Sequence, residues 1–329
     1  MKLVIGLLIT VFATLTVAGQ TPTLRIETEV PGLPSQLFYG NVKVKPVRLR
    51  PGTTTPITIN DSDFFVQQQY LDFLLRFPDQ SGFNFWQGEI NNCSPKPACT
   101  DGSRTNTSGA FFLSIEFTET GTLAVRTMKA AFGDATGQSG LGEPQGVTHP
   151  LQVPIIKRSE FLPDQIQLSN GVIVGPNTGW QAVLEANKVA YFNGFVTRPA
   201  FTSAYPTSQT PAQYVDALFV KTGITPSTAD RNAAIAEFGG AGNTTDNAAR
   251  ARALRKVAEN TTFAAAEKNR VFVLMQYFGY LRRDPNGGQD TDHTGYEYWL
   301  QKLNSFNGDF HQAEMVRSFL VATEYIDRF

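Results

Sequence analysis

The chain has 329 residues, and its 28 basic and 29 acidic side chains leave a formal net charge of −1. There is no basic excess to attract a phosphate backbone, so nucleic acid is excluded as an expected partner. Charged residues make up only 17% of the chain, and phenylalanine occurs 25 times. This composition indicates a protein that buries much aromatic surface or keeps some exposed for a partner.

The first residues are typical of a secretory signal peptide. Lys2 provides the positive start, an apolar run follows over residues 3–17, and small residues at 16–19 offer a cleavage site. We therefore assign residues 1–19 to a signal and expect an exported protein, either periplasmic, at the cell surface or extracellular. An uncleaved anchor is the alternative, because the run approaches the roughly 18 residues of a membrane span. We expect no membrane span in the mature chain.

Residues 20–60 alternate apolar and polar side chains, with Pro and Gly between the alternating runs. This pattern predicts a short β-rich extension. The segment is too short to form a stable sandwich by itself.

A motif of aromatic, aliphatic and turn residues then occurs twice. The first copy begins at Tyr70 and the second at Tyr277, near the C-terminus. The other matched pairs are Arg76 and Arg283, Phe85 and Tyr298, and Trp86 and Trp299. A repeated segment indicates one supersecondary unit used more than once. Helical periodicity around both copies predicts a mainly α fold built from repeated helical-hairpin units, two clear copies and one eroded copy.

The domain organisation follows from these patterns. We expect a first helical unit over 61–135, a Gly/Pro-rich connection over 136–179 and a C-terminal helical lobe over 180–329 that holds the second clear copy. Within the connection, residues 157–161 suggest a turn and residues 171–175 a short strand.

Each copy pairs an arginine with a glutamate at a matching position. Arg76 and Glu116 belong to the first copy, and Arg283 and Glu324 to the second. An arginine at a helix C-terminus can reach such a carboxylate, so we predict a structural Arg–Glu clamp in each unit. A catalytic carboxylate would need a second acid or a base, which neither motif supplies.

The repeated aromatic pairs allow two interpretations. The Phe85-Trp86 and Tyr298-Trp299 pairs could form flat platforms for sugar rings. The simpler interpretation is core packing, because aromatic side chains at helical spacing are usually buried.

The two cysteines, Cys93 and Cys99, are separated by only five residues. In an exported chain such a pair most simply forms a local disulfide. A metal site is the competing interpretation, but none of the three histidines stands at ligand spacing from the cysteines.

The second copy carries an acidic insertion that is a candidate calcium site. Its candidate ligands are the side chains of Asp284, Asn286, Asp290 and Asp292. Alternating oxygen ligands and an exported location suit calcium. The spacing does not match an EF-hand loop, however, and Asp292 aligns with Asp79, which is explained as a helix cap. No other cofactor is expected.

Five segments together form a recognisable pattern over about residues 63–329: 70–82 with Phe85-Trp86, 110–117, 212–219, 250–259 and 272–283. This pattern resembles the bacterial domain-of-unknown-function family 4214, in its exported acidobacterial type. It implies a helical unit distantly similar to phycobilisome linker domains, found in exported and cell-surface proteins. The resemblance assigns no catalytic residues.

Three functions remain in order of preference. The first is a non-enzymatic helical scaffold or protein-interaction module of the bacterial envelope or extracellular space, whose partner is an envelope protein or a second copy of the chain. The second is a carbohydrate- or calcium-dependent surface-binding module. The third is an exported hydrolase, although the chain lacks a Gly-x-Ser-x-Gly elbow, a zinc motif and a phosphate loop. Its candidate residues would be Asp63, Asp79, Glu116, His293 and Glu324.

Overall fold

The computed structural model describes residues 23–45, 47–93 and 96–329. The expected signal peptide lies outside the described residues. The chain divides into two compact units, Met1–Pro46 and Val47–Phe329. Among the described residues, no helix combines the length and apolar character that a membrane crossing requires.

The first unit contains a three-stranded antiparallel sheet. Its strands are β1 (Leu24–Glu27), β2 (Gln36–Tyr39) and β3 (Val42–Val44), in the order β1-β2-β3. Tyr39 pairs with Val42, and Gly40 in the turn between them has a φ of 59°. A two-residue hairpin turn needs such a left-handed backbone, which glycine adopts without strain. The predicted N-terminal β extension is confirmed.

The second unit is mainly helical, as the sequence predicts. It opens with α1 (Ser62–Gln69), the π-helical turn η1 (Tyr70–Leu74), α2 (Gln80–Asn91), α3 (Pro97–Leu113), α4 (Ile115–Glu119) and α5 (Gly121–Phe132). It closes with α12 (Thr261–Met275), the π-helical turn η2 (Gln276–Leu281), α13 (Thr294–Ser305), α14 (Met315–Leu320) and α15 (Thr323–Ile326). The two copies of the sequence motif therefore begin in corresponding elements, each with a π-helical turn.

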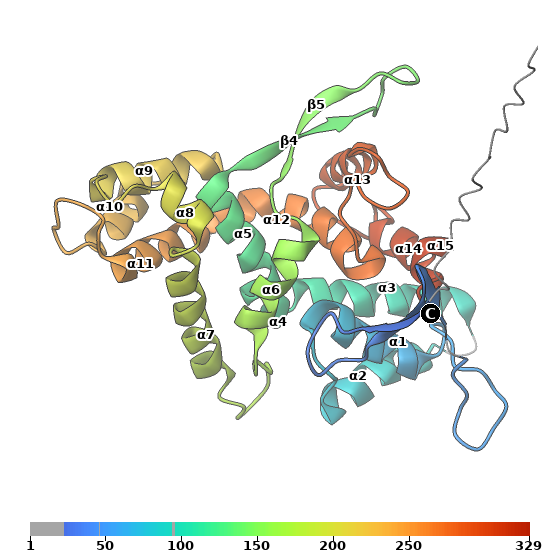
Figure 1. The fold of residues 1–329 in the computed structure, drawn as a ribbon. Helices are drawn as coiled ribbons and strands as arrows, with labels where there is room; N and C mark the ends of the chain where they lie inside the picture. Colours follow the sequence, from blue (N-terminus) through green and yellow to red (C-terminus); the bar gives the residue numbers. More distant parts are fainter. Residues whose placement is uncertain (1–22, 46, 94–95) are drawn as a thin grey trace, which may run out of the picture. The chain divides into compact units, whose positions relative to one another are not determined.

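Between these two groups lie a hairpin and six further helices. They are β4 (Asp134–Ser139), β5 (His149–Pro154), α6 (Arg158–Ser169), α7 (Trp180–Phe195), α8 (Pro199–Ala204), α9 (Pro211–Thr222), α10 (Thr228–Ala236) and α11 (Asn247–Ala258). The antiparallel hairpin β4–β5 contacts α12 and α13, and its tip projects beyond the helices of this unit (Figure 1). Helix α5 contacts α6, α9, α11 and α12, and so joins the middle of the unit to its ends.

Two local expectations for the connection are corrected by the structure. The segment that suggested only a turn begins the twelve-residue helix α6, with the Glu160 carboxylate accepting from the Lys157 N–H at 3.0 Å. The short strand expected over 171–175 is absent, and the Val174 N–H instead donates to the Glu116 carboxylate. A strand needs a neighbouring strand for its backbone groups, and here a side chain takes that place.

The two π-helical turns pack against each other in the core. The Phe73 ring meets the Tyr280 ring edge-on, with centroids 5.2 Å apart. Gly279 lies directly against the Phe73 ring, so a side chain at this position would collide with it. The Tyr280 hydroxyl is hydrogen-bonded to Ser108, which in turn donates to Gln69. Contacts between residues far apart in sequence thus join the two ends of the second unit.

A buried carboxylate reinforces this junction. The Asp72 side chain in η1 is 0% exposed and accepts from Arg282, Arg328 and Gln68 at 2.7 to 3.0 Å. Burial alone would raise the pKa of Asp72, but the two guanidinium groups outweigh this and hold the pKa below its usual value. The ion-pair network therefore links η1 with the end of η2 and with the C-terminal residues.

Replacing Asp72 should lower stability in a pH-dependent way. Asp72→Asn leaves two guanidinium groups without their shared anion, which should cost about 3 kcal/mol at neutral pH. Because the folded pKa is depressed, the contribution of Asp72 is complete above the unfolded value near 3.8 and is lost as the pH falls through the folded value. Urea unfolding at pH 7 and at stepped pH values below 4 should therefore show the gap between wild type and variant closing in acid.

The matched control for this experiment is Asp101→Asn. Asp101 pairs with Arg317 at the surface, with both side chains at least 40% exposed. Its replacement should change stability little, because exposed pairs contribute little. An Asp72→Asn variant that matched Asp101→Asn at pH 7 would contradict the assigned role of the buried network.

A disulfide joins Cys93 to Cys99 and so ties the end of α2 to the first turn of α3. This is the predicted loop staple. The double variant Cys93→Ser/Cys99→Ser should lose about 2 kcal/mol, since closing even a short loop restricts the unfolded chain. Urea unfolding with and without reductant measures this loss. Reductant should leave the double variant unaffected, and a wild type equally insensitive to reductant would count against a stabilising disulfide.

Candidate functional site

The described part of the second unit contains a pocket of about 550 Å³ beside the first Arg–Glu pair. It lies between η1, the start of α2, the end of α3 and the segment 173–178. Its apolar lining residues are Tyr70, Leu74, Trp86, Ala110, Phe111, Ile115, Ile173, Val174 and Pro176. Arg76, Asp79, Ser81, Ser114, Glu116 and Thr178 contribute polar groups. Mostly apolar walls with a few convergent polar groups are typical of ligand pockets of this size.

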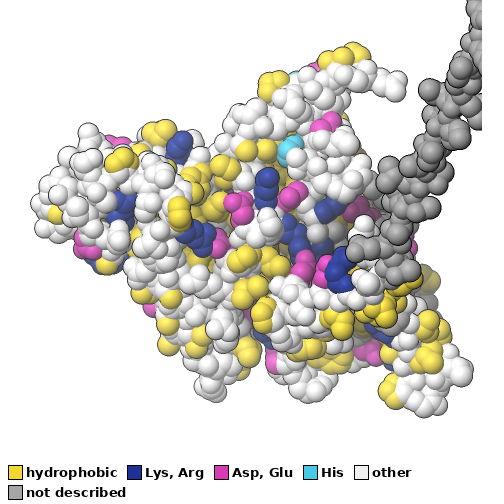
Figure 2. Space-filling model, viewed as in Figure 1, with side chains coloured by type: hydrophobic (Ala, Val, Ile, Leu, Met, Phe, Trp, Pro, Cys, Tyr) yellow, Lys and Arg dark blue, Asp and Glu magenta, His cyan; other side chains and the backbone are white. Residues whose placement is uncertain are grey.

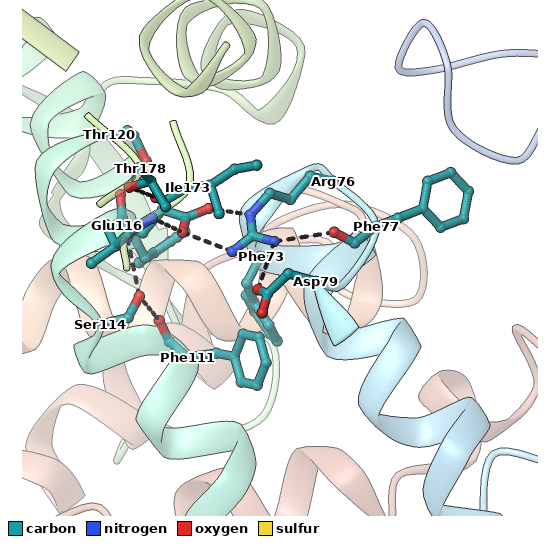
Figure 3. Close-up of polar contacts among 12 residues, drawn as sticks. Phe73, Arg76, Phe77, Asp79, Phe111, Ser114, Glu116, Thr120, Ile173 and Thr178 are labelled. Atoms are coloured by element: carbon teal, nitrogen blue, oxygen red, sulfur yellow. Dashed lines mark hydrogen bonds and ion pairs between the residues drawn. The ribbon is translucent and has the colours of Figure 1, made fainter. Parts of the chain in front are cut away.

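The Arg76–Glu116 pair forms one side of the pocket (Figure 3). Arg76 Nε donates to Glu116 Oε1 at 2.7 Å, and Nη2 donates to Oε2 at 3.0 Å. The structure thus brings the two residues together in the two-pronged geometry that arginine and carboxylate favour. The guanidinium also lies 4.9 Å from the centre of the Tyr70 ring. The Glu116 side chain is only 4% exposed, so the pair is a buried one.

The segment 173–178, which was expected to be part of a connection without a functional role, also lines the pocket and lies beside Glu116 (Figure 3). The Val174 N–H donates to Glu116 Oε2 at 3.3 Å and so attaches this segment to the Arg–Glu pair. The Thr178 hydroxyl donates to the carbonyls of Ile173 and Gly175 and holds the segment in a turn. The sequence alone does not predict that this segment lines a pocket, because its position depends on contact with a residue 58 positions away.

Asp79 lies at the edge of the pocket and begins α2. Its Oδ1 accepts from the Gly82 N–H at 2.9 Å and from the Ser81 hydroxyl at 2.7 Å, which is the predicted N-cap. The Gly82 hydrogen bond, together with Arg76, lowers the pKa of Asp79. Oδ2 makes only a 3.5 Å contact with Arg76 Nη1. The side chain is 38% exposed, so this oxygen belongs to a carboxylate that a ligand can reach.

The repeated aromatic residues divide into two kinds. Trp86 and Trp299 are half-buried and pack on Phe111 and Phe319 of their own units, at 5.8 and 5.6 Å between ring centroids. Phe85 and Tyr298 are 56% and 45% exposed, so core packing is wrong for these two residues. Each precedes its tryptophan on a helix, where adjacent side chains point in different directions, and here the tryptophan packs on the core while the residue before it faces outward.

Tyr70 and Tyr277 are buried beneath the two arginines, and each hydroxyl lies against a glycine of the following helix, Gly82 or Gly295. Burial raises the pKa of Tyr70 to about 12. The recurrence of glycine in both copies is explained by this close approach, since any side chain there would meet the tyrosine hydroxyl.

The second Arg–Glu pair has the same core geometry and different surroundings. Arg283 Nε and Nη2 donate to the Glu324 carboxylate at 2.6 and 3.0 Å. Arg283 Nη1 also donates to the carbonyls of Asp284, Pro285 and Gly287, and Nη2 donates to Asp290 at 2.8 Å. The insertion therefore folds onto its own guanidinium group and supplies it with acceptors.

The side chains of the candidate calcium site make hydrogen bonds within the protein. The carboxylate of Asp284 accepts from the Arg158 N–H at 2.7 Å, that of Asp290 binds Arg283, and that of Asp292 accepts from the Thr294 N–H at 2.8 Å. Asn286 is exposed. Within the described ranges, no three His, Cys, Asp or Glu side chains are grouped so that they could hold a metal ion. The insertion acts here as a structural loop that binds arginine.

The five candidate hydrolase residues lie in separate places, apart from one pair. Asp79 and Glu116 both line the pocket. Asp63 is paired with Arg50, Glu324 with Arg283, and His293 lies against Gly137 of the β4–β5 hairpin. Burial lowers the pKa of His293.

Comparisons of the chain with models of known protein families, with curated proteins and with solved structures found no match. The functional argument therefore depends on the residues of the site.

The two Arg–Glu pairs should differ in their contribution to stability. Glu116→Ala removes the acidic partner of Arg76 at a nearly closed site and should cost about 3 kcal/mol. Glu324→Ala should cost about 1 kcal/mol, because Arg283 keeps three carbonyls and Asp290 as acceptors. Urea unfolding of both variants measures the difference. Equal losses would show that the insertion does not compensate for Glu324.

Proposed function

We propose that this chain is an exported, non-enzymatic binding module of the bacterial envelope or extracellular space, and that the pocket of its first helical unit is the recognition site. The observation that carries the proposal is the pocket itself. It combines apolar walls with Arg76, Asp79 and Glu116 in a volume suited to a small group.

The state of the carboxylates favours binding over catalysis. Both oxygens of Glu116 already accept hydrogen bonds, from Arg76 and from the Val174 N–H. The pKa of Asp79 is lowered, so this carboxylate is ionised at neutral pH. A general acid must carry a proton at the working pH, so an ionised Asp79 does not suit that role. Glu116 is held by its hydrogen bonds, so Asp79 would have to act as a base or nucleophile without a second free carboxylate among the pocket residues.

The pocket also has an apolar rim that a partner can cover. Ile115 and Ile173 line it and are 55% and 40% exposed. On the face drawn in Figure 2, Lys and Arg side chains are interspersed with Asp and Glu side chains, without a broad field of one sign. Recognition through shape, apolar contact and hydrogen bonds suits this surface better than long-range attraction does.

The disulfide supports an exported location, because such bonds persist mainly outside the reducing cytosol. The predicted signal peptide and the resemblance to family 4214 support the same location.

An exported hydrolase is the second candidate function, and the shared position of Asp79 and Glu116 in one pocket is what favours it. Turnover of a bound ligand by the wild type, lost in Asp79→Asn, would establish this alternative.

Filling the pocket should abolish binding to envelope material. Ala110 lines the pocket from α3, so Ala110→Trp places a large ring in it. The matched control is Ser318→Trp, at the corresponding half-buried position of α14. Co-sedimentation of the mature chain with washed envelope fragments should be at least tenfold weaker for Ala110→Trp and unchanged for Ser318→Trp.

Circular dichroism and urea unfolding would test whether both tryptophan variants fold. Where Ala110→Trp does not fold, Asp79→Asn replaces it, because asparagine is also a good helix N-cap. A folded pocket variant that binds envelope fragments as well as the wild type, or a wild type that does not bind them, would overturn the proposal.

A further inference from the structure

In the pocket, one N–H of Arg76 and one carboxylate oxygen of Asp79 lie close together and remain available for a ligand. Of the five N–H groups of Arg76, two donate to Glu116, one to the carbonyl of Phe77 and one weakly to Asp79. The second proton on Nη2 has no partner among the described residues. Asp79 Oδ1 is occupied by Gly82 and Ser81, whereas Oδ2 has only the 3.5 Å contact with Arg76. A ligand therefore meets a guanidinium N–H next to a carboxylate oxygen.

The neighbouring guanidinium and carboxylate groups favour a ligand without net charge. An anion would approach two carboxylates, Asp79 and Glu116, and a cation would approach the Arg76 guanidinium. A hydroxyl group both donates and accepts a hydrogen bond, so it can satisfy either neighbour. Two adjacent hydroxyls can donate to Asp79 Oδ2 and accept from Arg76 Nη2 at the same time. The polar edge of the pocket thus matches a neutral ligand with neighbouring hydroxyl groups.

The aromatic walls present one accessible ring. Phe111 is 3% exposed, and Tyr70 is 4% exposed with the Arg76 guanidinium over its face. Trp86 is half-buried and lines the same pocket. The neighbouring Phe85 ring meets the indole at an interplanar angle of 75°, edge to face. Trp86 is thus the least buried of the three aromatic residues that line the pocket.

We infer that this pocket binds a neutral sugar ring, with its C–H face on Trp86 and two adjacent hydroxyls between Asp79 and Arg76. This inference rests on the proposed function and specifies its ligand. A pyranose has an apolar face and polar edges, as the pocket has an apolar wall and a polar edge. The volume of about 550 Å³ lies in the range of pockets that enclose small molecules.

The second helical unit does not offer the same site. The donors of Arg283 are occupied by carbonyls and Asp290 of its own insertion. The wall 173–178 is attached to Glu116, through the Val174 N–H. The matched positions of the second unit therefore provide internal controls.

The test is binding of the mature chain to an array of neutral oligosaccharides, followed by titration calorimetry with the strongest ligand. Trp86→Ala and Asp79→Asn should each weaken binding at least tenfold. Trp299→Ala and Asp292→Asn, the matched substitutions of the second unit, should leave the affinity unchanged. Affinity should also vary less than twofold between 50 mM and 500 mM salt, because a neutral ligand is not screened.

The outcomes separate the sugar inference from the proposed function. The chain could bind no glycan and still bind envelope fragments, with that binding lost in Ala110→Trp. This result would overturn the sugar inference and leave the proposed binding module intact. Protease treatment of the envelope fragments that abolishes binding would identify a polypeptide partner and likewise overturn the sugar. Binding equally affected by the substitutions at Trp86 and Trp299 would overturn the assigned position. Release of reducing ends from the bound glycan would support the sugar and overturn the non-enzymatic part of the proposed function.

Discussion

The contact between the two π-helical turns is the constraint on which the rest of the second unit depends. Phe73 packs on Tyr280 and Gly279, and the buried Asp72 carboxylate holds Arg282 and Arg328. A buried charge is tolerated only when its partners are in place, so this network favours one relative position of the two chain ends. The same turn η1 carries Tyr70 and Leu74, which form part of the pocket wall. The position of this pocket wall thus depends on a contact between residues that are 210 positions apart in the sequence.

The two Arg–Glu pairs have the same internal geometry but different surroundings. In both, a guanidinium group is held by a carboxylate and lies over a tyrosine ring. The second pair is completed by carbonyls of the acidic insertion, and its arginine is occupied. The first pair has no such insertion, and the segment 173–178 binds its Glu116 and lines the pocket beside it. Because of this difference, the proposed recognition site belongs to the first unit.

Much of the local structure could be predicted from the sequence. Asp79 begins a helix because its side chain caps it, and Cys93 and Cys99 are close enough in sequence to form a disulfide. The Arg–Glu pairs could also be predicted, since each pair recurs at nearly the same separation, 40 and 41 residues. The exposed Phe85 and Tyr298 could not, because an aromatic pair alone does not show which of its members faces the core.

The sequence by itself determined the helical class, the N-terminal strands, the caps and the matched arginine and glutamate residues, because these depend on residue type and short spacing. Only the tertiary structure decided that Val174 reaches Glu116, that Asp290 turns to Arg283, and that a pocket opens beside Trp86. These contacts depend on the path of the chain between distant residues. That path is set by the packing of the whole unit, which no local pattern records.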